Sequence, residues 1–243
     1  MKYVCFDTNY LLAVLIPLDN WKPIIKMCEA EIAELVDNQA IEVFITDKVE
    51  EEAKKRISDI AKNASQHFRK LFHSLKSTDL KKPFNKSSIL KLRKELQLIL
   101  RDESDKVIRN QLYFFEDYLL KNINEHPNKE KKILIGECIS EINEIIMRFD
   151  TELQVYSIRI ILKPTELMEI DKLDKIEDRI KAMVHNYNDS EILATFIYFI
   201  NEENTKGIFV THDFVDLLLN SLYLEEEFNE IHIVRPQYVK FLV

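Results

Sequence analysis

Glycine is scarce in this chain, which has only Gly136 and Gly207 among its 243 residues. Walker and dinucleotide-binding loops need glycines at several fixed positions, because their backbone must approach the phosphates closely. The sequence therefore excludes both kinds of loop. Cysteine is also sparse: Cys5, Cys28 and Cys138 lie far apart, without the C-x-x-C spacing of a zinc site. We expect three buried structural thiols, as in a protein of the reducing cytosol.

Long apolar runs and an excess of positive charge are also absent. No run of about 18 apolar residues occurs, and Asp7 interrupts the first apolar stretch. We therefore expect no membrane span, no secretory signal peptide and a cytoplasmic location. The net charge is -8, because 42 acidic residues outnumber 34 Lys and Arg, so a broad basic face for duplex nucleic acid is not indicated. The hydrophobic share of 46% supports a globular core.

Strand-like and helical segments alternate at both ends of the chain. Apolar, β-branched and aromatic residues predict strands at 2–7, 41–46, 155–162, 207–211 and 231–234. Helical periodicity predicts helices over 21–38, from Val49 to about Leu75, from Thr165, from Asp189, and after Asp213 to about Leu224. Such alternation is typical of parallel sheets with right-handed crossovers. The predicted fold class is α/β, with a central parallel sheet of four to five strands flanked by helices.

The middle of the chain differs from both ends. Residues 76–155 are charged and have a helical period, with breaks at 85–88 and 126–128, and predict two or three antiparallel helices. We therefore expect a discontinuous α/β domain, formed by 1–75 and 156–243, and a helical insertion over 76–155. The apolar stripes of the insertion offer a surface for a homodimer.

Acidic residues recur where the predicted strands end and where the helices begin. Asp7 stands at the end of the first predicted strand, and Asp213 lies two residues after the fourth. Glu52 lies one turn into the helix after the second strand, and Asp189 opens a later helix. In a parallel sheet, the carboxyl ends of the strands and the amino ends of the helices lie on the same edge. We therefore expect these four carboxylates to converge.

Four converging carboxylates without His or Cys suit a hard cation, Mg²⁺ or Mn²⁺, better than Zn²⁺. Such ions can activate water and stabilise the leaving oxygen in phosphodiester cleavage. Asn9 and Thr211 could orient the metal ligands or a water molecule from outside the metal's immediate shell.

Taken singly, each acid has a structural alternative. Asp7 and Asp213 could cap the helices that follow them, and Asp189 could complement a helix dipole. Glu51 and Glu52 are individually typical of a solvated helix face, and only one of them is expected to face the other acids. The combination of four acids in this order favours a metal site more than any single member does.

Four short segments, taken in order, resemble motifs of the PIN-domain ribonucleases. They are Phe6-Asp7-Thr8-Asn9, Thr46-Asp47-Lys48-Val49-Glu50-Glu51-Glu52, Asn188-Asp189-Ser190-Glu191-Ile192-Leu193-Ala194 and Val210-Thr211-His212-Asp213-Phe214. This family includes the toxins of toxin–antitoxin pairs and nucleases that process rRNA or tRNA. The resemblance covers about residues 1–60 and 160–243. The middle helices resemble no family, and compact toxin-type members lack so large an insertion.

The resemblance implies roles for particular residues. Asp7, Glu52, Asp189 and Asp213 would be the four catalytic and metal-binding acids. Asn9 and Thr211 would be the polar neighbours of the first and last of them, and Val49 would hold the apolar position of the V-x-x-E motif. Asp216 is a weaker candidate for an additional acid. Glu51 beside Glu52 leaves the register of the second acid open by one residue.

The function expected from this resemblance is an endoribonuclease that hydrolyses RNA with Mg²⁺ or Mn²⁺. RNA would be its substrate, and a toxin-type role would add an antitoxin partner. Two alternatives stay open. A haloacid-dehalogenase-type phosphatase also begins with an Asp after a buried strand, although Asn9 replaces its second Asp. The other alternative is an interaction protein on a PIN scaffold without catalysis.

Overall fold

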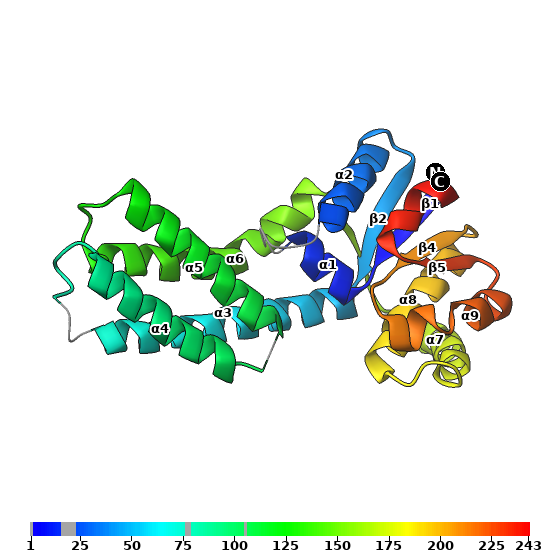
Figure 1. Cartoon of the computed structure of the whole chain (residues 1–243). Coiled ribbons are helices and arrows are strands. Elements are labelled where there is room, and N and C mark those ends of the chain that lie inside the picture. The colour runs from blue at the N-terminus through cyan, green and yellow to red at the C-terminus, as the bar shows by residue number, and fades with distance from the viewer. Residues whose placement is uncertain (1, 16–22, 76–78, 105) are drawn as a thin grey trace. The chain divides into compact units, whose positions relative to one another are not determined.

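The computed structural model describes residues 2–15, 23–75, 79–104 and 106–243. Within them the chain is α/β, with one five-stranded sheet in the order β3-β2-β1-β4-β5 (Figure 1). Every neighbouring pair of strands is parallel, as the sequence predicted. The strands are β1 (Lys2–Phe6), β2 (Ile41–Thr46), β3 (Arg159–Ile161), β4 (Gly207–Val210) and β5 (Ile231–Val234).

The chain divides into two compact units. The sheet unit comprises the described residues up to Lys54 together with Asp150–Val243, and the helical unit is Lys55–Phe149. The divisions fall inside two long helices, α3 (Asp47–Ser74) and α6 (Lys131–Val155), rather than at residues 76 and 155. Helical periodicity does not change where these helices pass from one unit to the other, so the pattern could not indicate these limits.

Helices cover both faces of the sheet. On one face, Phe199 of α8 (Tyr187–Glu202) contacts Tyr3 of β1 and Phe44 of β2, with ring centroids 5.7 and 5.1 Å apart. On the other face, Phe6 of β1 meets Tyr10 of α1 (Thr8–Leu15) with ring centroids 4.8 Å apart. Residues 3 and 6 of a strand point to opposite sides because side chains alternate along it. The sheet is therefore buried on both faces, as the apolar runs of its strands indicate.

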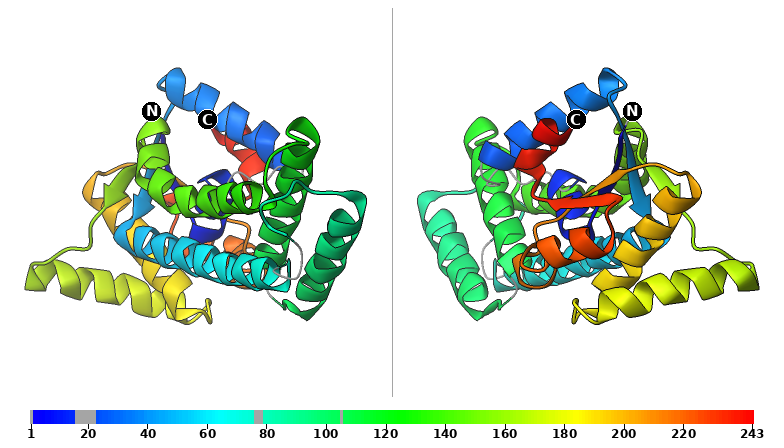
Figure 2. Two further views of the ribbon diagram at one scale, coloured as in Figure 1. Left: turned by 90° about the vertical axis from the view of Figure 1, so that its left-hand side faces the viewer. Right: turned by 90° about the vertical axis from the view of Figure 1, so that its right-hand side faces the viewer.

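Shorter elements complete the sheet unit. They are α2 (Pro23–Asp37), α7 (Leu167–Lys181), the π-helix η2 (Phe214–Leu218), α9 (Ser221–Glu227), the 3₁₀-helix η3 (Pro236–Tyr238) and α10 (Val239–Leu242). α7 packs on α8, α9 packs on β5, and α2 packs on β2 and α10. The two ends of the chain lie close together (Figure 2), and Lys2 Nζ donates a hydrogen bond to the Leu242 carbonyl.

Two predicted elements are shorter than the sequence indicated. The strand predicted over 155–162 is reduced to β3, because α6 extends to Val155 and a turn follows it. The helix predicted from Asp213 to Leu224 is divided into η2 and α9. The division falls at Asn220, whose side-chain amide donates to the Asp216 carbonyl at 2.8 Å.

The chain ends three helices in the left-handed backbone conformation without using glycine. Gln39, Ser157 and Asn204 have φ of 55°, 51° and 47° after α2, α6 and α8. Backbone hydrogen bonds that close these turns run at 2.9–3.0 Å from Ala40, Ile158 and Thr205 to the carbonyls of Leu35, Leu153 and Ile200. Glycine favours this position because it lacks Cβ. Gly207 instead permits a close approach, since a Cβ there would lie 2.4 Å from the Phe196 ring.

The helical unit contains α4 (Lys86–Asp102), α5 (Lys106–Glu125) and the greater parts of α3 and α6. Phe68 of α3 and Phe115 of α5 meet edge to face, with ring centroids 5.2 Å apart. Asn85 and Ser88 form a capping box at the start of α4. Ile142, Ile145 and Ile146, which belong to the apolar stripes expected in the insertion, lie outside the residues whose side chains are described.

Two expectations about the chain as a whole can be compared with the structure. The thiols of Cys5, Cys28 and Cys138 are free and buried, as expected. Among the described helices, none combines the length and apolar character needed to cross a bilayer.

Candidate metal centre

A buried hydroxyl connects the two acids that follow the strands. Asp7 directly follows β1, and its side chain is only 1% exposed. The Thr211 hydroxyl, just after β4, donates to Asp7 Oδ2 at 2.8 Å and accepts from the Asp213 backbone amide at 2.9 Å. The predicted Asp7, Thr211 and Asp213 are therefore brought together at the carboxyl edge of the neighbouring strands β1 and β4.

The Asp213 side chain is fixed as the N-cap of η2. Its Oδ1 accepts from the backbone amides of Val215 at 2.8 Å and Asp216 at 3.1 Å. The capping alternative considered from the sequence is therefore present for Asp213. Capping occupies one carboxylate oxygen, and it does not remove the residue from the group of acids.

Asp189, Asp213 and Asp216 form the tightest acidic group in the described part of the chain. One carboxylate oxygen of each lies within 4.8 Å of the others. Asp189 is in the first turn of α8, where Asn186 is the N-cap. Asp216 belongs to this acidic group because it lies in the first turn of η2, a π-helix that begins directly after Asp213. The sequence had indicated Asp216 only as a weaker candidate.

Burial and mutual repulsion disfavour the ionised forms of these acids. Burial raises the pKa of Asp7 to about 6; the Thr211 hydrogen bond opposes this, and the charges of Asp213 and Glu52 add to it. Burial, the charge of Asp7 and the proximity of Asp213 raise the pKa of Asp189 to about 8. A divalent cation would relieve the repulsion by stabilising the charged forms.

One oxygen of Asp189 accepts no hydrogen bond from the described residues, and the Asp213 side chain lies close enough to bond only to the protonated form of Asp189. The oxygen without a donor is Oδ2, and the Asp189 side chain is 8% exposed. A buried carboxylate oxygen without a donor is unfavourable, because it has lost water without gaining a replacement. A cation held by Asp189, Asp213 and Asp216 would supply that replacement.

Glu52, and not Glu51, lies on the side of α3 that faces Asp7. The Thr8 hydroxyl, next to Asp7 in the chain, donates to Glu52 Oε2 at 2.8 Å. The charge of Glu52 also raises the pKa of Asp7. The Glu51 side chain is 74% exposed and lies 3.9 Å from the Lys48 ammonium. Both lie on α3, where successive residues project in different directions, and this favours the register that the V-x-x-E motif indicates.

Asn9 is the polar neighbour that the sequence predicts beside Asp7. It lies in the first turn of α1 with its side chain exposed, and its amide forms no hydrogen bond with the described residues. Thr211, the other expected neighbour, is fully buried and bonded to Asp7.

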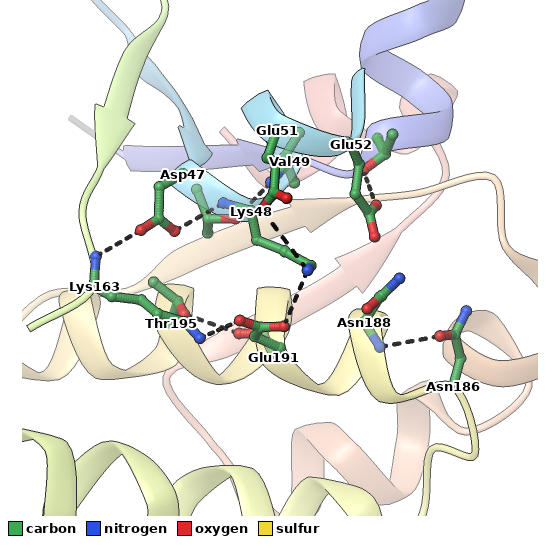
Figure 3. A network of polar contacts seen from close by, with 12 residues as sticks. Asp47, Lys48, Val49, Glu51, Glu52, Lys163, Asn186, Asn188, Glu191 and Thr195 are labelled. Atoms are coloured by element: carbon green, nitrogen blue, oxygen red, sulfur yellow. Dashed lines mark hydrogen bonds and ion pairs between the residues drawn. The ribbon is translucent and has the colours of Figure 1, made fainter. Parts of the chain in front are cut away.

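A second polar network, which the sequence did not indicate, joins the start of α3 to α8 (Figure 3). The buried Glu191 of α8 lies between two ammonium groups, those of Lys48, at 3.6 Å, and Lys163. Asp47 holds the same region by accepting from the backbone amides of Lys48 at 2.8 Å and Lys163 at 3.1 Å. The network connects the start of α3, the segment after β3 and α8, which are far apart in the sequence.

The chemistry of the donor set fits a hard divalent cation. The available ligand atoms are carboxylate and hydroxyl oxygens, which Mg²⁺ and Mn²⁺ prefer. The acidic group of Asp189, Asp213 and Asp216 contains no His or Cys, the ligands typical of Zn²⁺ sites.

Comparisons with known proteins found no match for the chain among protein-family models, curated proteins or solved structures. The fold and the side-chain geometry are therefore the basis for a functional proposal.

Proposed function

We propose that this protein is a Mg²⁺- or Mn²⁺-dependent endoribonuclease. The observation that carries the proposal is the Asp189 carboxylate: it is buried, one of its oxygens accepts no hydrogen bond from the described residues, and it lies within 4.8 Å of oxygens of Asp213 and Asp216. Perturbed acids that converge at the carboxyl edge of a parallel sheet are candidates for a functional site. The resemblance of the short motifs to PIN-domain ribonucleases supports the same reaction class.

Each acid has a separate task in this proposal. Asp189, Asp213 and Asp216 would hold the cation. Asp7 and Glu52 would orient water and add negative charge near it. A bound divalent cation supplies Lewis-acid polarisation of the phosphate and offsets the charge that develops in the transition state.

The chain's own residues fix the geometry before any substrate binds. Thr211 holds Asp7 through its hydroxyl, and Thr8 holds Glu52 in the same way. The backbone amides at the start of η2 hold Asp213. Such preorganisation lowers the reorganisation needed during reaction. An antitoxin partner, a homodimer and the alternative of a non-catalytic interaction protein stay predictions from the sequence.

The experiment measures RNA cleavage and metal binding separately. Purified wild type is incubated with labelled single-stranded RNA and Mn²⁺, Mg²⁺ or EDTA, and Mn²⁺ binding is measured by calorimetry. We expect cleavage only with a divalent cation, and we expect Asp189→Asn to lower the rate by at least about 100-fold, in the range known for removal of one stabilising group. Asp178→Asn, which alters a side chain that is 78% exposed, is the matched control.

Two results would overturn the proposal. One is RNA cleavage that is equal in wild type and Asp189→Asn. The other is Mn²⁺ binding without cleavage of any RNA, which would favour an interaction protein or another phosphohydrolase.

A further inference from the structure

An arginine lies at the same sheet edge as the acids. Arg235 directly follows β5, whose Val234 pairs with Val210 of β4. The Thr211 amide donates to the Val234 carbonyl at 3.1 Å, which extends the pairing past the end of β4. Arg235 therefore stands at the end of the strand beside the one that leads to Asp213.

The Arg235 guanidinium is available to bind a ligand. In the part of the chain that the structure describes, no carboxylate pairs with it and its N–H groups make no hydrogen bond. Lys48 and Lys163, by contrast, both pair with Glu191. A guanidinium binds a phosphate through two parallel hydrogen bonds, which a paired lysine cannot do. A local cation is needed here, because the chain's net charge of -8 repels a polyanion.

An exposed aromatic ring lies against this arginine. The Arg235 guanidinium is 5.5 Å from the centre of the Phe214 ring, and the ring side chain is 57% exposed. Phe214 directly follows Asp213, which fixes the start of η2 by capping it. The ring is therefore attached to the proposed metal ligand by one peptide bond, and its position is set by the same turn.

A nearby arginine–phenylalanine pair shows what a structural pair looks like. Arg179 lies 4.6 Å from the Phe228 ring centre, but Phe228 is 3% exposed and Arg179 pairs with Glu227. Neither the ring nor the guanidinium of that pair is therefore available to a ligand. Phe214 and Arg235 instead leave both the ring and the guanidinium accessible to a ligand.

We propose that Phe214 and Arg235 form a nucleotide subsite of the acid centre, in which a base of single-stranded RNA stacks on Phe214 and Arg235 binds the adjoining phosphate. Single strands suit this geometry because their bases can leave their own stack and lie on an aromatic ring. The subsite rests on the proposed ribonuclease function and names the form of RNA that the site takes.

The test measures RNA binding without cleavage. The probe is a fluorescent single-stranded RNA of about 12 nucleotides, in the range that such proteins cover, and anisotropy is measured with Ca²⁺ in place of Mg²⁺. We expect Phe214→Ala to weaken binding about tenfold, because base stacking has this magnitude, and Phe214→Tyr to restore it. An RNA lacking its bases should bind Phe214→Ala and wild type equally.

Arg235 has a different expected signature. Arg235→Gln should weaken binding and lower the slope of log affinity against log salt by about 0.7, the value for one phosphate contact on a single strand. The matched controls are Arg179→Gln and Leu222→Ala, which change a paired arginine and a side chain that is 74% exposed. Both controls should bind RNA as the wild type does, and circular dichroism should show that every variant is folded.

The outcomes separate the subsite from the proposed chemistry. If Phe214→Ala weakens binding while wild type fails to cleave RNA with Mn²⁺, the subsite stands and the ribonuclease function fails. If wild type cleaves RNA, and Phe214→Ala and Arg235→Gln bind it unchanged, the subsite alone is overturned. Absence of RNA binding by wild type, or tighter binding of duplex than of single strands, also overturns it.

Discussion

Asp189→Asn should stabilise the protein in the absence of metal, and the gain should grow with pH. The pKa of Asp189 is raised from 3.8 to about 8 by burial and by the charges of Asp7 and Asp213. The folded state therefore holds a proton that the unfolded state releases above pH 4. The stabilising contribution of this proton is fully present below the pKa of Asp189 in the unfolded state and is lost as pH rises through its pKa in the folded state. The free energy of unfolding of the wild type therefore falls between about pH 4 and pH 8.

The magnitude follows from the shift. One pKa unit corresponds to about 1.4 kcal/mol, so a shift of about four units amounts to ~6 kcal/mol as an upper bound. Part of the repulsion is shared with Asp7 and Asp213, and the protein relaxes around a single charge, so we take roughly half, about 3 kcal/mol. Asn has nearly the same shape as Asp and does not ionise. At pH 8 we therefore expect Asp189→Asn to raise the free energy of unfolding by about 3 kcal/mol, with near equality at pH 4.

Urea denaturation followed by circular dichroism measures this difference at several pH values with EDTA present. Asp178→Asn is the control, and it should change stability by less than about 0.5 kcal/mol at every pH, as exposed substitutions do. Saturating Mn²⁺ should stabilise wild type, by about 2.7 kcal/mol at 100 times the dissociation constant, and should stabilise Asp189→Asn less. Equal stabilities from pH 4 to pH 8, or a loss at pH 8, would refute the argument.

Two further predictions concern the Thr211 hydroxyl and the left-handed helix ends. Thr211→Val removes the bond to Asp7 and should raise the pKa of Asp7 above its value of about 6, measurable by NMR titration of the carboxyl; an unchanged pKa would contradict the bond's role. Gln39→Gly should stabilise the protein by about 1 kcal/mol in thermal unfolding, because its φ is 55° and a side chain is strained there. Asn204→Gly is its control and should gain less, because Asn tolerates this conformation.

The sequence was sufficient for the strands that are rich in β-branched and aromatic residues. The strands β2 and β5 have the bounds that were predicted, because such residues dominate both and clear breaks flank them. The prediction was wrong at β3, because Ser157 ends α6 in a left-handed turn that nothing in its type indicates. Local patterns give the identity of an element more reliably than its ends.

The candidate site shows a similar division. Asp7, Asp189 and Asp213 could be placed from the sequence because each stands where a predicted strand ends or a helix begins. The choice between Glu52 and Glu51 depends on a hydrogen bond from Thr8, 44 residues away, which no local pattern indicates. The contribution of Asp216 depends on η2 being a π-helix, and helical periodicity does not distinguish it from an α-helix.

The central strand of the sheet imposes an order on assembly. β1 lies between β2 and β4 in the sheet. β4 is synthesised long after β1, because most of the chain lies between them. Asp7 and the Thr211 hydroxyl that fixes it are 204 residues apart. At about 5–20 residues per second, synthesis of that interval takes roughly 10–40 s.

For most of that interval the growing chain contains Asp7 and Glu52 but neither Asp213 nor the strand that leads to it. The proposed metal centre, which needs Asp213, could therefore not bind a cation until β4 has been synthesised and has joined β1. The order of the strands in the sheet therefore delays formation of the proposed nuclease site until β4 has been synthesised.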